Sequence, residues 1–215
     1  MGAAVKANVL RMHELDPGFV LTPLRYERDL AITDGTPLRD IAVLARQTIS
    51  PAKAATFDRI VILDTTHARN GLLDCEQALA ANAKVGGSKK IIEVGDVVIS
   101  RLRPYLRQVA FVDEGAAPGL PICGSTEFYV IRSLDGQSIS FLVPWLLSDR
   151  VQQLLANSQE GGHHPRFNDE VLMRLMVPAA VMARRAELSE TVEHASKAYR
   201  QCRSLLKSAA DLVAG

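Results

Sequence analysis

The middle of the chain carries the side chains best suited to bind an anion. Six Lys or Arg residues against two acidic ones give the segment from Lys84 to Arg107 a local charge of +4, whereas the whole chain has only +1. Arg101, Arg103 and Arg107 surround Tyr105, and the adjacent proline indicates a loop or strand end. A guanidinium there can pair with a phosphate or a guanine edge, and Tyr105 can stack on the same surface. The other basic candidates are Lys89 and Lys90. A solvated basic loop is the alternative.

The sequence GGHHPRF at residues 161–167 is a second candidate site. Its two glycines let the backbone approach a ligand closely. His163 and His164 are adjacent, so they point in different directions on an extended chain, and no further Cys or His lies near them in the sequence to complete a metal site. Together with Arg166, they predict a polar loop that contacts either DNA or only solvent.

Two hydroxyl side chains form a third candidate. Ser125 and Thr126 directly precede the strand-like sequence EFYVIR. Such hydroxyls can bind a phosphate or a base edge, but they can equally cap a turn. The sequence leaves both interpretations open.

Patterns that would indicate catalysis are absent from the sequence. It contains no glycine-rich phosphate loop, no dinucleotide fingerprint, no G-x-S-x-G and no H-E-x-x-H. The three cysteines lie far apart, which gives neither a disulfide framework nor a zinc spacing. We therefore expect no catalytic residue, no metal and no cofactor, and we do not favour an enzyme.

Composition limits the class of protein further. With 47% hydrophobic residues, a chain of 215 residues can bury a core without disulfides. The near-neutral charge means that any nucleic-acid face must be local. Neither a signal peptide nor an apolar run of about 20 residues is visible, and unpaired cysteines suit a reducing compartment. We expect a soluble, cytoplasmic protein that does not bind a membrane.

The elements that position these residues are mostly short strands. β-Branched and aromatic runs predict strands at residues 59–63, 108–112, 127–132 and 175–179, and two more within 91–99 around Gly95-Asp96. Thr36 and Pro37 suggest the start of a short helix. Leucine spacing predicts a helix over 141–156, and Asn168 is suited to cap another that extends through Met173.

The last part of the chain differs from the rest. Residues 181–213 contain no Gly and no Pro, and apolar or small residues recur there with alternating steps of four and three. These residues are Leu188, Val192, Ala195, Tyr199, Cys202, Leu206, Ala209 and Val213. A helix of this length measures about 45–50 Å, so part of it should project as a coiled-coil arm, unless it packs back on its own globule. We predict an α+β fold, with residues 1–179 as one domain and 180–215 as the long helix.

Several segments, in order along the chain, resemble one half of the DNA specificity subunit of type I restriction–modification systems. TPLRDIA at 36–42 looks like the family's "PLGEI" opening, and VGDVVISRLR at 94–103 is similar to its "GDILISRLR" segment. GSTEFYVIR at 124–132 resembles "STGFYVLR", with Glu127 where Gly is common. LMVP at 175–178 looks like the strand before the family's long helix, although the second Pro and the Gln are missing here. A usual subunit has two recognition domains and two helices, and this chain has one of each.

The resemblance implies a sequence-specific, non-catalytic DNA-binding chain. The recognition domain would bind half of a split double-stranded DNA site, and the helix would pair antiparallel with a counterpart. That pair would dock a methyltransferase subunit, with the restriction subunit as a further partner. A chain with a single unit could form a homodimer, which predicts a palindromic, gapped target. The alternative is a scaffold that assembles through the helix without binding DNA.

Within that interpretation, the arginines of the basic segment are the first candidate DNA contacts. These are Arg101, Arg103 and Arg107. The secondary candidates are Tyr105, Lys89, Lys90, Ser125, Thr126, His163, His164 and Arg166. Lysine contacts to phosphate should make affinity salt-dependent, whereas Arg and Ser or Thr at base edges should choose the sequence.

Overall fold

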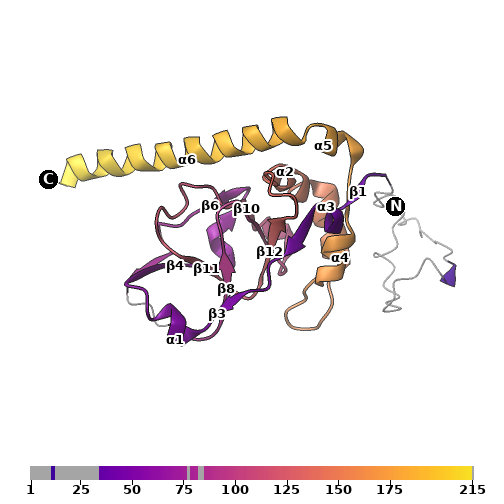
Figure 1. Ribbon diagram of the computed structural model, residues 1–215, viewed down its shortest axis with the longest axis horizontal. Coiled ribbons are helices and arrows are strands. Elements are labelled where there is room, and N and C mark those ends of the chain that lie inside the picture. Colours follow the sequence, from indigo (N-terminus) through magenta and orange to yellow (C-terminus); the bar gives the residue numbers. More distant parts are fainter. Residues whose placement is uncertain (1–10, 13–33, 77, 82–84, 215) are drawn as a thin grey trace, which may run out of the picture.

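The computed structural model describes residues 11–12, 34–76, 78–81 and 85–214. Two larger β-sheets, a group of short helices and one long helix make up the molecule (Figure 1). The strands are β1 (Thr36–Pro37), β2 (Ala42–Leu44), β3 (Thr48–Ile49), β4 (Arg59–Leu63), β5 (Ala68–Arg69), β6 (Leu72–Leu73), β7 (Leu79–Ala81), β8 (Lys89–Ile92), β9 (Val97–Ser100), β10 (Val109–Phe111), β11 (Ile122–Gly124), β12 (Phe128–Ser133) and β13 (Met176–Val177). The α-helices are α1 (Pro51–Ala54), α2 (Leu142–Leu146), α3 (Asp149–Asn157), α4 (Asp169–Arg174), α5 (Ala179–Ala183) and α6 (Arg185–Ala214), and the 3-10 turns are η4 (Leu38–Asp40), η5 (Thr65–His67) and η6 (Pro104–Leu106).

A four-stranded antiparallel sheet lies at the centre, in the order β10-β9-β12-β2. Alternate side chains of β9 face opposite sides, as the period of two in a strand requires. Val97 and Ile99 join the core under the helices, whereas Val98 joins the core between the two sheets. Because both faces are covered, β9 is apolar along most of its length instead of alternating.

The second sheet has the order β3-β8-β11-β4-β7, with β11 parallel to β4 and the other pairs antiparallel. Strands β8 and β9 follow each other in the sequence around Gly95 but enter different sheets. Gly95 has a φ of +92°, a backbone conformation that side chains rarely adopt. The two strands expected within residues 91–99 are therefore confirmed, and the turn between them connects the sheets.

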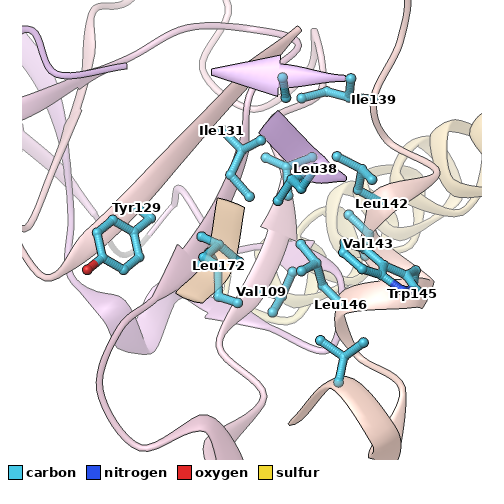
Figure 2. Packing of buried hydrophobic residues seen from close by; sticks show 14 of the residues in the cluster. Leu38, Val109, Tyr129, Ile131, Ile139, Leu142, Val143, Trp145, Leu146 and Leu172 are labelled. Atoms are coloured by element: carbon cyan, nitrogen blue, oxygen red, sulfur yellow. The ribbon is translucent and has the colours of Figure 1, made fainter. Parts of the chain in front are cut away.

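Short helices cover the outer face of the central sheet. Figure 2 shows Leu142, Val143 and Leu146 of α2 lying near Val109 and Ile131 of the sheet. The helix expected over residues 141–156 is in fact two helices. Ser148 separates them, because its hydroxyl accepts a hydrogen bond from the Val151 N–H and so caps α3.

The short helix expected from Thr36 and Pro37 is only the single 3-10 turn η4, which begins one residue later than predicted. Thr36 and Pro37 form β1, which pairs with β13 near the other end of the sequence, and the next N–H, that of Leu38, donates to Leu175 O at 2.9 Å. Only the single turn η4 follows before β2 pairs with β12. Tertiary strand pairing outweighs the local helix preference in this segment.

The long helix α6 confirms the expected element and lies along one side of the globule (Figure 1). Leu188 and Val192 pack against the core under the helices, and Ser196 is buried. Beyond Arg203 the side chains are exposed, with Leu206 64% and Val213 90% accessible. The first part of the helix therefore packs back on its own globule, and the last part projects. The fold is α+β with a long C-terminal helix, as predicted. No helix in the described ranges has the length and apolar character needed to span a membrane.

Candidate nucleic-acid interface

The three candidate segments of the sequence come together at one place in the fold. Arg166 pairs through its backbone with Leu102, and the Phe167 N–H donates to Arg101 O at 3.3 Å. Tyr129 follows the third segment, Ser125 and Thr126, in the sequence, and its hydroxyl donates to Phe167 O at 3.0 Å. The loop that joins α3 to α4 extends from the side of the globule opposite α6 (Figure 1). We call residues 101–107, 124–127 and 161–167 together the loop cluster.

Glu127 connects the three segments of the loop cluster. Its carboxylate accepts from Arg101 Nε at 2.7 Å, and from Arg166 Nε at 2.9 Å and Nη2 at 2.6 Å. The hydrogen bonds from Arg166, and after them those from Arg101, outweigh partial burial and lower the pKa of Glu127 to about 2. Glu127 is therefore ionised at neutral pH, and the three side chains together carry a charge of +1.

The turn after β11 fixes the backbone of Glu127. The Ser125 N–H donates to Leu63 O at 2.8 Å, and the Ser125 hydroxyl accepts from the Glu127 N–H at 3.2 Å. A Cβ on Gly124 would lie 2.6 Å from Ile92 Cδ1 and 3.1 Å from Phe128 Cδ2, so a side chain there would have to displace its neighbours. Ser125 therefore caps the turn, while Thr126 is exposed.

The basic segment contains arginines in two different environments. Arg103 is exposed, and Tyr105 on η6 is 69% accessible. The Arg107 side chain instead turns toward the helices, where Nη1 donates to Leu147 O at 2.6 Å and Nη2 forms an ion pair with Asp149. Both Arg103 and Arg107 have left-handed backbone, with φ of 46° and 50°, which is uncommon for residues other than glycine. Arg107 thus holds η6 against α2 and α3.

The two lysines of β8 lie on opposite faces of their sheet. Lys90 lies opposite Gly124 in the register of β8 and β11, next to the loop cluster. Burial, and then the nearby charges of Arg46 and Arg101, lower its pKa. Lys89 lies near Cys123, and burial raises the pKa of that thiol more than Lys89 lowers it. Of the two lysines, the structure brings only Lys90 to the loop cluster.

Sequence reasoning missed two residues of this site. Arg46 lies close to Lys90 and forms an ion pair with Asp169 at 2.5 Å. Nothing in the sequence marks it, since it stands alone between two short strands. One feature of the sequence could have marked Glu127 as a site residue: it stands at a motif position where Gly is common in type I specificity subunits.

The loop cluster can supply hydrogen-bond donors and positive charge. His163 and His164 are exposed, and within the described ranges no three or more His, Cys, Asp or Glu side chains form a group that could hold a metal ion. Guanidinium, ammonium and hydroxyl groups together suit phosphate oxygens and base edges. Lys84, the first residue of the basic segment, lies outside the described residues.

Comparison with solved structures supports this fold. One similar chain comes from a structural study of complex assembly and conformational transition of the type I R-M system, with a TM-score of 0.57 and 23% identity over 83% of this chain. Another is the HsdS subunit from Thermoanaerobacter tengcongensis, with a TM-score of 0.51 and 19% identity over 83% of this chain. No family model and no curated protein match the sequence.

The resemblance to type I specificity subunits is therefore confirmed at the level of the fold. The chain shares the arrangement of sheets and helices with these two structures. The match covers 46% of each of those chains, so this chain spans about half of their length.

Proposed function

We propose that this chain is the sequence-specific DNA-recognition module of a type I-like restriction–modification system. One observation carries the proposal: three separate segments of the sequence converge into a basic loop cluster, on a fold similar to that of an HsdS subunit. The chain would direct a partner methyltransferase, and with it an endonuclease, to the target. The chemistry would then belong to the partners and not to this chain.

The environments of the candidate residues support different roles. Arg103, Tyr105, Thr126, His163 and His164 are exposed and suit direct contact with DNA. Arg101, Arg166 and Lys90 are partly buried and contribute positive charge to the same surface. Arg107 and Ser125 are bonded within the protein and position the loops, and Lys89 faces away.

The long helix suits assembly. We place the boundary between the recognition domain, residues 1–179, and the helical part, residues 180–215, in the first turn of α5, shortly after β13; the helical part comprises most of α5 and all of α6. Large apolar side chains are exposed near the end of α6, including Leu206 and Leu212. Such residues favour pairing with a second helix, either from another copy or from a partner subunit.

Changing Arg103 to Ala tests DNA binding most directly. We expect about tenfold weaker binding to a mixed-sequence duplex and a slope of log affinity against log salt that is smaller by about one, as the loss of one phosphate contact requires. Fluorescence anisotropy over a range of salt concentrations measures both. Arg59→Ala is the matched control, because Arg59 is exposed at the opposite end of β4 from the loop cluster.

Two results would contradict the proposal. Equal salt slopes for Arg103→Ala and Arg59→Ala would remove Arg103 from the interface. A wild-type chain that binds neither heparin nor duplex DNA, yet still assembles, would favour the scaffold alternative that the near-neutral net charge leaves open.

A further inference from the structure

We propose that Glu127 is a specificity-determining residue of the loop cluster. Its carboxylate restrains Arg101 and Arg166, so that the Arg101 guanidinium binds a base edge in a fixed geometry rather than any phosphate within reach. This inference rests on the proposed function.

The contacts of Glu127 support a restraining role. One oxygen, Oε2, accepts from both Arg101 and Arg166, and the other, Oε1, accepts from Arg166 alone. Arg166 is additionally fixed by a bond from Nη1 to His164 O at 2.8 Å. Since these residues come from three different segments, a single carboxylate sets how the loops lie relative to one another.

Glu127 cannot easily move away from the two arginines. Its own N–H donates to the Ser125 hydroxyl, and the next residue, Phe128, is fully buried between the sheets. The side chain of Glu127 is 21% exposed, compared with 32% for Arg101 and 37% for Arg166. The arginines thus lie further out than the carboxylate that holds them.

The balance between affinity and selectivity follows from this geometry. A mobile arginine gains a phosphate contact on any sequence, which is the source of non-specific, salt-dependent binding. The charge of Glu127 neutralises one of the two guanidiniums and repels phosphate. At the same time, Arg101 is bonded to Glu127 through Nε, on the stem side of its guanidinium. No second carboxylate pairs with Arg101 in the described part of the chain, and its other side-chain partner is the Tyr129 hydroxyl. A guanidinium that is already restrained loses less conformational freedom when it pairs with a base, which favours the base contact over a phosphate contact.

The test compares Glu127→Gln with the wild type on two kinds of DNA. A selection from a library of randomised duplexes defines the sequence that the wild type prefers, and anisotropy then measures binding to that duplex and to a scrambled one. In Glu127→Gln we expect binding to the scrambled duplex to become tighter, with a salt slope steeper by about one. The affinity ratio between the two duplexes should fall by about tenfold.

Two further variants separate charge from geometry. Glu170→Gln removes the same charge from α4, where Glu170 pairs only with Arg174 of its own helix, and we expect it to preserve the selectivity. Glu127→Asp retains the charge but cannot reach both arginines, so selectivity should fall with little change in the salt slope. Thermal unfolding of each variant checks that the globule remains folded, and Glu127→Asp keeps the test decisive if Glu127→Gln is unstable.

The outcomes distinguish this inference from the proposed function. A wild type that selects a sequence, together with unchanged selectivity in both Glu127 variants, overturns the role of Glu127 and leaves the recognition function in place. A wild type that binds no DNA overturns both. Loss of selectivity in Glu127→Gln and Glu127→Asp, but not in Glu170→Gln, supports the inference.

Discussion

Arg103 and Arg107 lie on either side of the same short turn but have different environments. Arg103 is exposed, whereas Arg107 bonds to the end of α2 and to Asp149 of α3. The sequence could not separate them, because the partner of Arg107 at Leu147 lies 40 positions away and only folding brings the two together. The same limit applies to Glu127, whose partner Arg166 is 39 positions further along the chain.

This contrast between the two arginines predicts effects of different size on stability from the same substitution. Arg107→Ala should lower the free energy of unfolding by about 1 kcal/mol, since it removes the bond to the Leu147 carbonyl, while the exposed ion pair with Asp149 adds little. Arg103→Ala should change it by less than about 0.5 kcal/mol. Urea denaturation of both variants measures the difference. Equal destabilisation by the two would show that Arg107 does not position the turn.

At the scale of elements, the sequence predicted those whose signals are local. The strands at 59–63, 108–112 and 127–132 and the helix capped by Asn168 are confirmed within a residue or two. The helix predicted at Thr36 begins later and is shorter than expected, because Thr36 and Pro37 pair with β13 instead. Local patterns also could not predict which sheet each strand joins, since β8 and β9 are neighbours in the sequence but lie in different sheets.

Three arginines of α6 form ion pairs with the globule, in addition to the apolar packing of Leu188 and Val192. Arg185 pairs with Asp135, Arg200 with Asp113 and Arg203 with Glu76. The Arg200–Asp113 pair is the most enclosed of the three: Arg200 Nε donates to Asp113 Oδ1 at 2.7 Å, and the side chains are 21% and 12% exposed. The pairs of Arg200 and Arg203 hold the part of α6 that lies beyond its apolar contacts at Leu188 and Val192.

Removing one partner of the enclosed pair should therefore loosen the helix. Arg200→Gln leaves the Asp113 carboxylate poorly compensated, which should cost about 3 kcal/mol. Arg203→Gln, at a more exposed pair, should have a much smaller effect, because solvent screens that pair. Amide hydrogen exchange along α6 measures both effects. Similar protection of the helix in the two variants would show that the Arg200 pair does not hold it.

At the scale of the whole molecule, the structure changes which face of α6 is free to pair. Leu188 and Val192, the first residues of the predicted seam, pack on the globule. The exposed face carries small and apolar residues at steps of three and four. These are Ala195, Ala198, Cys202, Leu205, Ala209 and Leu212. In an antiparallel homodimer centred on Cys202, Ala195 would lie opposite Ala209 of the second copy, seven residues away on either side.

This arrangement predicts a dimer that can be trapped by oxidation. Cys202 is exposed, whereas Cys75 and Cys123 are buried, so the two copies of Cys202 should form a disulfide across the two-fold axis. A non-reducing gel should show a dimer for the wild type and none for Cys202→Ser. Light scattering of the reduced protein provides the control without a crosslink. A monomer at high concentration, with and without DNA, would argue against the homodimer and against the palindromic, gapped target that it implies.

The loop between α3 and α4 closes on itself. The Glu160 N–H donates to Arg166 O and the Arg166 N–H donates to Glu160 O, both at 2.9 Å. Next to these bonds, where the loop begins and ends, Gln159 Nε2 donates to Pro165 O. The residues between these bonds, 161–164, are exposed. A side-chain exchange at this tip leaves the closing backbone bonds in place, whereas a deletion that removes His164 O also removes a partner of Arg166 Nη1. The tip can therefore change its side chains, but not its length, without loosening the base of the loop.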